Sequence, residues 1–128
     1  MTRYLTVEQV LFLHTRVIDE TGGTHGVREL GLLESALMRP RATFATRELY
    51  PDILAKAAAL LQSLVQNHAF LDGNKRTGLI AMGLFLRFNS WQLLADNQEA
   101  ETFILAIAVS KLDLTAIQAW LKQHAHPV

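Results

Sequence analysis

The chain has 128 residues, the length of one compact domain, so we expect a single domain over residues 1–128. Half of the residues are hydrophobic, which fits a packed core and excludes a disordered or fibrous chain. Twelve Lys and Arg balance twelve Asp and Glu, which excludes a globally basic surface for binding nucleic acid. The chain has no cysteine, which excludes disulfides, thiolate metal sites and cysteine nucleophiles and is typical of a cytoplasmic protein.

The sequence contains no recognisable targeting or membrane segment. Charged and polar residues interrupt the first residues, which therefore do not resemble a signal peptide. The longest apolar run, residues 79–86, is far shorter than the roughly 20 residues that a membrane span needs. We therefore expect a cytoplasmic protein that does not bind a membrane.

Hydrophobic spacing predicts two helices in the first forty residues. The first follows Thr6, which forms a capping-box pattern with Gln9, and it is expected to end at the glycine pair 22–23. The second spans residues 30–37 and must stop near Pro40, because proline disfavours helical geometry in the residue before it. Residues after this proline, up to position 50, lack a regular spacing and predict an exposed, partly extended connection that could form a flap.

Two apolar helices joined by a short polar loop form the predicted centre of the molecule. A third helix is expected from Pro51 to around residues 67–69, followed by the polar loop 72–76. The fourth helix is apolar nearly all round, which is typical of a buried central helix. Gly78 and Gly83 lower its helix propensity, and we expect a neighbouring helix to approach closely at both.

Two further helices complete the predicted fold. An acidic stretch at residues 96–101 opens a fifth helix, and a sixth follows Asp113. His124 and His126 lie in a tail that is expected to fray. The fold class is therefore all-α, a compact bundle of about six helices around a central helix–loop–helix hairpin.

The loop between the third and fourth helices concentrates chemically active side chains. The free N–H groups and dipole of a helix start favour anions, and Gly73 allows the backbone to approach a ligand. Lys75 and Arg76 add positive charge, and Arg76 can bind two phosphate oxygens. Asp72 is an oxygen ligand suited to Mg²⁺, and His68 can accept a proton near neutral pH. Together these groups favour a nucleotide polyphosphate site.

Each of these residues also has an ordinary structural interpretation. A histidine at a helix end is commonly a cap, and basic residues in a first helical turn are commonly solvated. Lys75 and Arg76, however, stand where the helix dipole disfavours cations, and a bound anion would offset that cost. A zinc or iron site at His68 and Asp72 is disfavoured because no third ligand follows at a matching spacing.

The nine residues from position 68 resemble the signature of the Fic/Doc family, His-x-Phe-x-(Asp/Glu)-(Gly/Ala)-Asn-(Gly/Lys)-Arg. The matching residues are His68, Phe70, Asp72, Gly73, Asn74, Lys75 and Arg76. The chain length and the order of helices resemble the small Doc (death-on-curing) branch, and the similarity extends from about Thr6 to Leu121. The resemblance thus covers nearly the whole chain.

The resemblance implies a role for each matching residue. His68 would be the general base toward a Ser or Thr hydroxyl of a protein target, and Asp72 would hold Mg²⁺. The residues implied to bind the phosphates of ATP are Gly73, Asn74, Lys75 and Arg76. The implied catalytic residues are His68, Asp72, Lys75 and Arg76. Phe70 would support the motif from the core.

The resemblance also bears on which group is transferred. Fic proteins that transfer AMP have glycine in place of Lys75 and a second arginine in place of Leu79. These two differences resemble the Doc branch and imply transfer of the γ-phosphoryl group, a reaction that needs positioning and positive charge more than a strong base. Gly73 is instead typical of the AMP-transferring members, so AMP transfer remains the alternative.

The Doc resemblance implies a bacterial toxin that blocks translation by modifying elongation factor Tu and is silenced by a Phd-like antitoxin. Family members that restrain themselves carry the sequence (Ser/Thr)-x-x-x-Glu-(Gly/Asn), which this chain lacks, so restraint is expected from another chain. Arg39, Arg41 and Arg47 lie on the flap-like connection, where they either help to dock the target by strand addition or are simply solvated.

Two alternatives belong to other functional classes. The chain could be a helical module that binds the antitoxin or another partner without chemistry, but the intact His68, Asp72, Asn74 and Arg76 argue against a degenerate site. A helix-turn-helix DNA-binding protein is disfavoured by the apolar central hairpin and the zero net charge, so we expect no direct nucleic-acid partner.

Overall fold

The computed structural model describes residues 1–128 and is mostly helical, which confirms the prediction of an all-α fold. The α-helices are α1 (Val7–Thr21), α2 (Leu30–Met38), α3 (Ile53–Gln66), α4 (Asn74–Phe88), α5 (Asn97–Ala108) and α6 (Leu114–His124). A short 3₁₀-helix, η1 (Arg39–Arg41), follows α2. The strands are β1 (Thr43–Phe44), β2 (Arg47–Glu48), β3 (Trp91–Leu93) and β4 (Ala125–Pro127).

Side-chain caps fix where the helices begin. The predicted capping box of Thr6 and Gln9 is present at α1, and Asp96 forms a second one with Glu99 at α5. Helix α3 starts at Ile53, two residues later than predicted, because the Asp52 carboxylate accepts a hydrogen bond from an N–H of the first turn. No helix combines the length and the apolar character that crossing a membrane requires.

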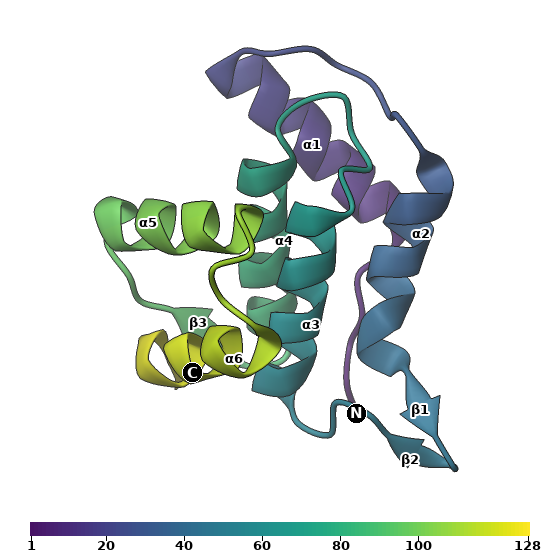
Figure 1. Ribbon diagram of the computed structural model, residues 1–128, viewed down its shortest axis with the longest axis vertical. Coiled ribbons are helices and arrows are strands. Elements are labelled where there is room, and N and C mark those ends of the chain that lie inside the picture. The colour runs from purple at the N-terminus through teal and green to yellow at the C-terminus, as the bar shows by residue number, and fades with distance from the viewer.

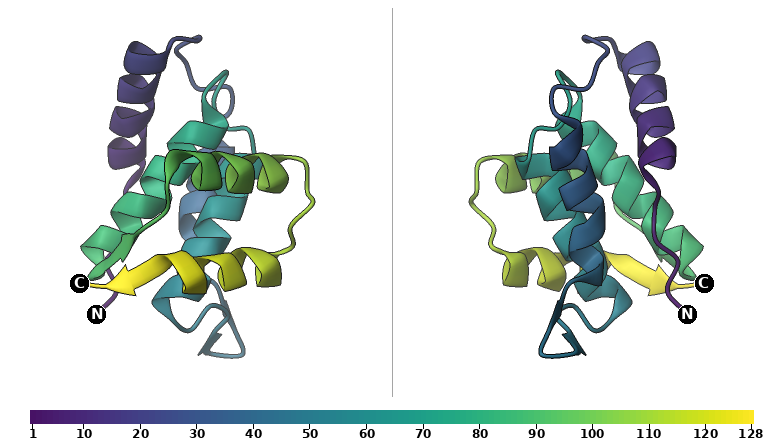
Figure 2. Two further views of the ribbon diagram at one scale, coloured as in Figure 1. Left: turned by 90° about the vertical axis from the view of Figure 1, so that its left-hand side faces the viewer. Right: turned by 90° about the vertical axis from the view of Figure 1, so that its right-hand side faces the viewer.

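Helices α3 and α4 form the centre of the molecule, as predicted (Figure 1). Eleven of the fourteen residues of α3 are buried. Helices α5 and α6 cover one side of this hairpin and α2 covers the opposite side, while α1 packs on α4 (Figure 2). The loop that joins α3 to α4 therefore emerges from the most buried part of the fold.

The two glycines of α4 have different surroundings. A Cβ atom at Gly78 would lie 3.0 Å from the Cγ2 atom of Val65, so α3 and α4 do approach closely there. A Cβ atom at Gly83 would meet nothing within 4 Å. The expectation of a close neighbour is confirmed at Gly78 and wrong at Gly83, where α4 faces open space.

The C-terminal residues do not fray, which corrects the sequence-based expectation. Strand β4 pairs with β3, and the His124 imidazole forms hydrogen bonds with the backbone oxygen of Trp120 at 2.8 Å and with the Glu99 carboxylate at 3.3 Å. The rings of Phe103, Trp120 and His124 stack in sequence at centroid separations of 3.8 Å. Of the two histidines in this region, only His126 is exposed.

The connection between α2 and α3 forms a projecting hairpin of β1 and β2. Its two turn residues, Ala45 and Thr46, have φ values of 51° and 66°, the left-handed geometry of a tight two-residue hairpin. The hairpin and the α3–α4 loop lie at opposite ends of α3 (Figure 1), which at 1.5 Å per residue spans about 21 Å. The hairpin is therefore not a flap over that loop.

The three arginines near the hairpin differ in their availability. The Arg39 guanidinium points inward and donates to the side chains of Tyr50, Gln62 and Ser63 on and before α3. Arg41 and Arg47 are exposed. Only these two remain available to a partner.

Lys56 anchors the hairpin to the core. Its side chain is buried, and its ammonium group donates to the Glu48 carboxylate at 2.8 Å and to the Pro40 carbonyl at 3.2 Å. Burial alone lowers the pKa of Lys56, but the Glu48 carboxylate and the Tyr4 hydroxyl outweigh it, so the net pKa is raised above 10.5. Lys56 therefore remains charged in the folded protein at neutral pH.

We expect Lys56→Met to lower the free energy of unfolding by about 1.5–3 kcal/mol, because it removes hydrogen bonds from a charged donor. Since folding raises the pKa of Lys56, its contribution is complete below pH 10.5 and is lost as the pH rises through the folded value. Urea unfolding at pH 7 and pH 11 checks both statements. Lys122→Met, at an exposed position of α6, is the control, and an equal effect of the two substitutions would contradict the anchor.

Candidate functional site

Phe70 fixes the middle of the α3–α4 loop. Its side chain is 3% exposed, and its ring stacks on the imidazole of His14 in α1 at a centroid separation of 3.8 Å and an interplanar angle of 7°. Its backbone forms an isolated antiparallel bridge with Val27, in the segment between α1 and α2. Phe70 thus ties the loop to two other parts of the chain.

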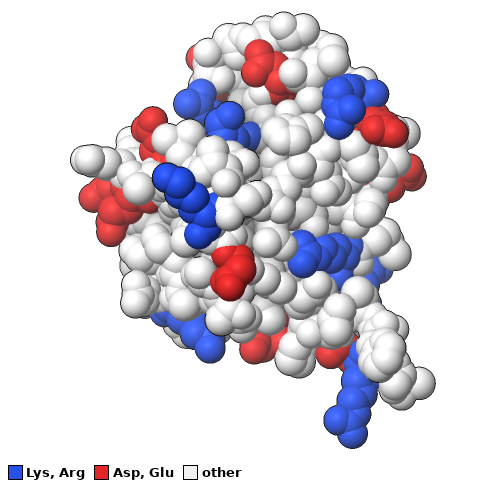
Figure 3. Space-filling model, in the orientation of Figure 1, with Lys and Arg blue, Asp and Glu red and all other residues white.

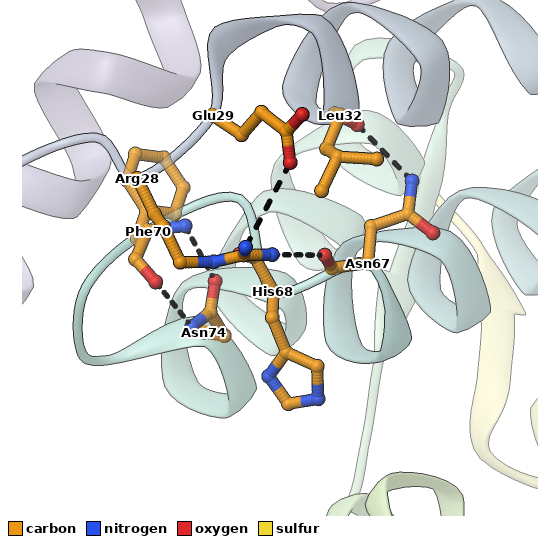
Figure 4. Close-up of polar contacts among 7 residues, drawn as sticks. All are labelled: Arg28, Glu29, Leu32, Asn67, His68, Phe70 and Asn74. Atoms are coloured by element: carbon orange, nitrogen blue, oxygen red, sulfur yellow. Dashed lines mark hydrogen bonds and ion pairs between the residues drawn. The ribbon is translucent and has the colours of Figure 1, made fainter.

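Asn74 closes the loop from its other end. Its side-chain oxygen accepts from the N–H of Phe70, and its side-chain nitrogen donates to the carbonyl of Phe70, both at 3.0 Å (Figure 4). Asn74 is also the first residue of α4. Its side chain is therefore engaged within the loop, and its backbone N–H is the group free to meet a ligand.

His14 is a site residue that the sequence reasoning missed. It is 3% exposed, and its Nε2 atom lies 2.8 Å from the carbonyl oxygen of Asp72. The sequence does carry a signal for the burial of His14, because this polar residue lies on the same helix face as the apolar residues Val10 and Val17. His14 is positioned by α1 to hold both the ring of Phe70 and the backbone before α4.

Gly73 caps α4 in a conformation that favours glycine. Its φ of 75° is left-handed, and a Cβ atom there would lie 3.0 Å from the Cδ1 atom of Ile18. Glycine at this position thus has a local cause, the tight approach of the loop to α1.

The Asp72 carboxylate is exposed but held in place. One oxygen accepts from the N–H of Gly73 at 2.9 Å and the other accepts from the N–H of Thr24 at 3.2 Å. The close approach depends on Gly23, where a Cβ atom would lie 2.6 Å from the carboxylate. Gly23, the second residue of the glycine pair that follows α1, therefore makes room for Asp72.

A cleft of about 620 Å³ opens beside the start of α4. The end of α1, the start of α4 and one face of α5 line it. The predicted site residues in its lining are Asp72, Gly73, Asn74, Lys75 and Arg76. Its other polar lining residues include Asn97 and Glu101 of α5, and its apolar lining residues include Leu79 and Ile104. Lys75 and Arg76 are exposed and form no ion pair within the chain.

His68 lies outside the lining of this cleft. Its side chain is exposed, its ring forms no hydrogen bond, and its backbone has a φ of 53°. Figure 4 shows that the guanidinium of Arg28 holds the backbone of residues 67 and 68, while the imidazole points away from it. The structure therefore gathers the cations and Asp72 in the cleft and leaves His68 on the outer part of the same loop.

Asp72 is the one acidic side chain of the loop that could hold a metal ion. Neither at this loop nor elsewhere in the structure do three His, Asp or Glu side chains lie close enough to form a cluster of metal ligands. Mg²⁺ is commonly bound by one or two carboxylates together with phosphate oxygens and water. Each Asp72 oxygen accepts one backbone N–H and keeps a further lone pair, so the residue fits Mg²⁺ shared with a phosphate.

Charged side chains of both signs are interspersed on the face drawn in Figure 3, where no continuous basic surface forms. This distribution agrees with the zero net charge of the chain. On this face, positive charge is therefore local and does not form an extended anion-binding surface.

We expect Gly23→Ala to lower the free energy of unfolding by about 1–3 kcal/mol, because a methyl group would meet Asp72 and the φ of 114° strains alanine. The exchange of the Thr24 amide hydrogen, read by NMR, is expected to accelerate as its bond to Asp72 is lost. Gly31→Ala, in an open position of α2, is the control and is expected to be neutral or stabilising. Unchanged Thr24 exchange in Gly23→Ala would contradict the described contact.

Comparison with known proteins gives this site a context. The sequence profile described as the "Fic/DOC family" matches residues 4–86. The chain is 46% identical over 123 residues to "Toxin Doc" of Mycolicibacterium smegmatis, covering 94% of this chain and 92% of the relative. It is 29% identical over 121 residues to "Protein kinase doc" of Escherichia phage P1, covering 94% of each chain. The chain that presents this loop and cleft belongs to the Fic/Doc family.

Proposed function

We propose that this protein is the toxin of a bacterial toxin–antitoxin pair and transfers the γ-phosphoryl group of ATP to a Ser or Thr hydroxyl of a protein. The observation that carries the proposal is the cleft, where the start of α4, two unpaired cations and an aspartate meet. An unpartnered imidazole stands on the same loop. These are the parts that phosphoryl transfer needs: positioning, positive charge and a proton acceptor.

The start of α4 is the proposed phosphate site. The first backbone hydrogen bond at this end runs from the N–H of Thr77 to the carbonyl of Gly73. The N–H groups of Asn74, Lys75 and Arg76 have no helical acceptor and are available to phosphate oxygens. The side chains of Lys75 and Arg76 would add charge-assisted bonds, Arg76 in a two-pronged geometry.

His68 is the proposed general base. The target hydroxyl oxygen forms a bond to the γ-phosphorus, the bond from that phosphorus to the β-phosphate oxygen breaks, and ADP leaves. The hydroxyl proton passes to a ring nitrogen of His68. Because neither ring nitrogen is engaged in a hydrogen bond, the imidazole can accept this proton without losing an existing partner.

Asp72 is the proposed ligand of Mg²⁺. The ion would neutralise negative charge on the phosphates when it is bound. The backbone N–H groups of Gly73 and Thr24 orient the carboxylate before any ligand arrives, so little further ordering of this side chain is required.

AMP transfer is the alternative that the sequence left open. The left-handed φ of Gly73 and its closeness to Ile18 account for glycine there without reference to the transferred group. Leu79, in place of the second arginine of the AMP-transferring members, contributes an apolar side chain to the cleft. The first observation removes Gly73 as an argument for AMP transfer, and the second favours phosphoryl transfer.

The partners are proposed from the family resemblance, with which the names of the relatives agree. One relative is named a toxin and the other a protein kinase, and both are similar to this chain over nearly its full length. We propose elongation factor Tu as the protein substrate, inhibition of translation as the outcome, and a Phd-like antitoxin as the silencing partner. A binding module without catalysis is the alternative from another class.

Label transfer from ATP separates these functions. We expect the purified chain with Mg²⁺ to move label onto purified elongation factor Tu from the γ-phosphorus and not from the α-phosphorus. His68→Ala, at an exposed position, is expected to reduce the rate by about 10²–10⁴-fold while leaving the fold intact. Label from the α-phosphorus would establish AMP transfer, and label from neither would favour the binding module.

We expect transfer to require Mg²⁺ and Asp72. Addition of EDTA is expected to abolish label transfer, and Asp72→Asn is expected to raise the Mg²⁺ concentration needed for half-maximal rate, because an amide is a weaker ligand than a carboxylate. Glu101→Gln, on the α5 wall of the cleft, serves as a carboxylate-to-amide control. An unchanged Mg²⁺ dependence in Asp72→Asn would remove the residue from the proposed metal site.

A further inference from the structure

The backbone of His68 is held in a conformation that its side chain disfavours. Its φ of 53° is left-handed, which costs a non-glycine residue about 1–2 kcal/mol. The imidazole forms no hydrogen bond that could fix its direction. Contacts of the backbone therefore determine where the ring stands.

Arg28 makes those contacts. Its Nε atom donates to the carbonyl of His68 at 2.8 Å, and its Nη2 atom donates to the carbonyl of Asn67 at 3.2 Å (Figure 4). These carbonyls follow the end of α3, where no further turn of helix supplies donors. The planar guanidinium thus bridges the two peptide units on either side of the left-handed residue.

The backbone around Arg28 is held independently of its side chain. The N–H groups of Arg28 and Glu29 both donate to the carbonyl of Ala69, at 2.8 and 3.0 Å. The Asn67 side chain donates to the carbonyl of Leu32 at 3.1 Å. Removal of the Arg28 side chain would leave these hydrogen bonds in place. The removal would therefore mainly affect the backbone conformation of His68.

We propose that Arg28 is a positioning residue that holds the His68 peptide in its left-handed conformation and so aims the imidazole at the target hydroxyl. This inference rests on the proposed role of His68 as general base. Arg28 does not line the cleft, so we expect it to make no contact with the nucleotide. Its loss should therefore affect the rate of transfer and not the affinity for ATP.

The test compares Arg28→Met with Arg16→Met. Both arginines are about half exposed and form an exposed ion pair, Arg16 with Glu20 and Arg28 with Glu29, but only Arg28 contacts the loop. We expect Arg28→Met to lower kcat for label transfer by about 10- to 100-fold, with KM for ATP unchanged. Arg16→Met is expected to match the unmodified protein, and Arg28→Lys, which keeps one charged donor, is expected to restore part of the rate.

NMR provides a readout that does not depend on activity. The Cα chemical shift and the HN–Hα coupling of His68 report its φ, and we expect both to move toward averaged values in Arg28→Met only. If the unmodified protein transfers no label that depends on His68, the proposed function fails while this readout still tests the hold of Arg28. Unchanged His68 signals, or a normal kcat in folded Arg28→Met, would overturn the positioning role.

Discussion

The candidate site depends on the burial of Phe70. The loop between α3 and α4 must return to the core after a few residues, and Phe70 is its one large buried side chain, stacked on His14. Its backbone is bonded on one side to Asn74 and lies beside Val27 on the other. Phe70 therefore holds together α1, the segment after α1 and the start of α4. The positions of the polar residues on either side of Phe70 depend on these contacts.

The hydrogen-bonding pattern divides the loop into two functional parts. On one side, Asp72 and the cations after it face the cleft, with the carboxylate oriented by two N–H groups. On the other side, His68 stands outside the cleft with a free ring. For a transfer reaction this division is reasonable, because the nucleotide and the protein hydroxyl must approach the transferred phosphorus from opposite directions. In the proposed reaction, one face of the loop serves the nucleotide and the other serves the protein hydroxyl.

Local features of the fold were predictable from the sequence, and distant contacts were not. The capping box at Thr6 was readable because hydrophobic spacing and caps act within a few residues. The expected loop 72–76 was right only for residues 72–73, because Asn74, Lys75 and Arg76 form the first turn of α4. The short strands were missed because two or three residues show no alternation. His14 contacts the loop at a residue 58 positions away, and Arg28 contacts it at a residue 40 positions away. Neither a histidine nor an arginine indicates from the sequence alone which distant residue it contacts. The order of helices was accessible, but the packing of α1 and its following segment on the loop required the structure.

The fit between Gly23 and Asp72 has a consequence for how the sequence can vary. A methyl group at position 23 would meet the carboxylate at position 72, 2.6 Å away, in addition to the strain of a φ of 114°, so the effects of substitutions at the two positions should not fully add. An alanine at position 23 should be tolerated better in a chain that already has a smaller residue at position 72. The two positions, 49 apart in the chain, are therefore expected to be epistatic, while the left-handed φ favours glycine at position 23 whichever residue stands at position 72.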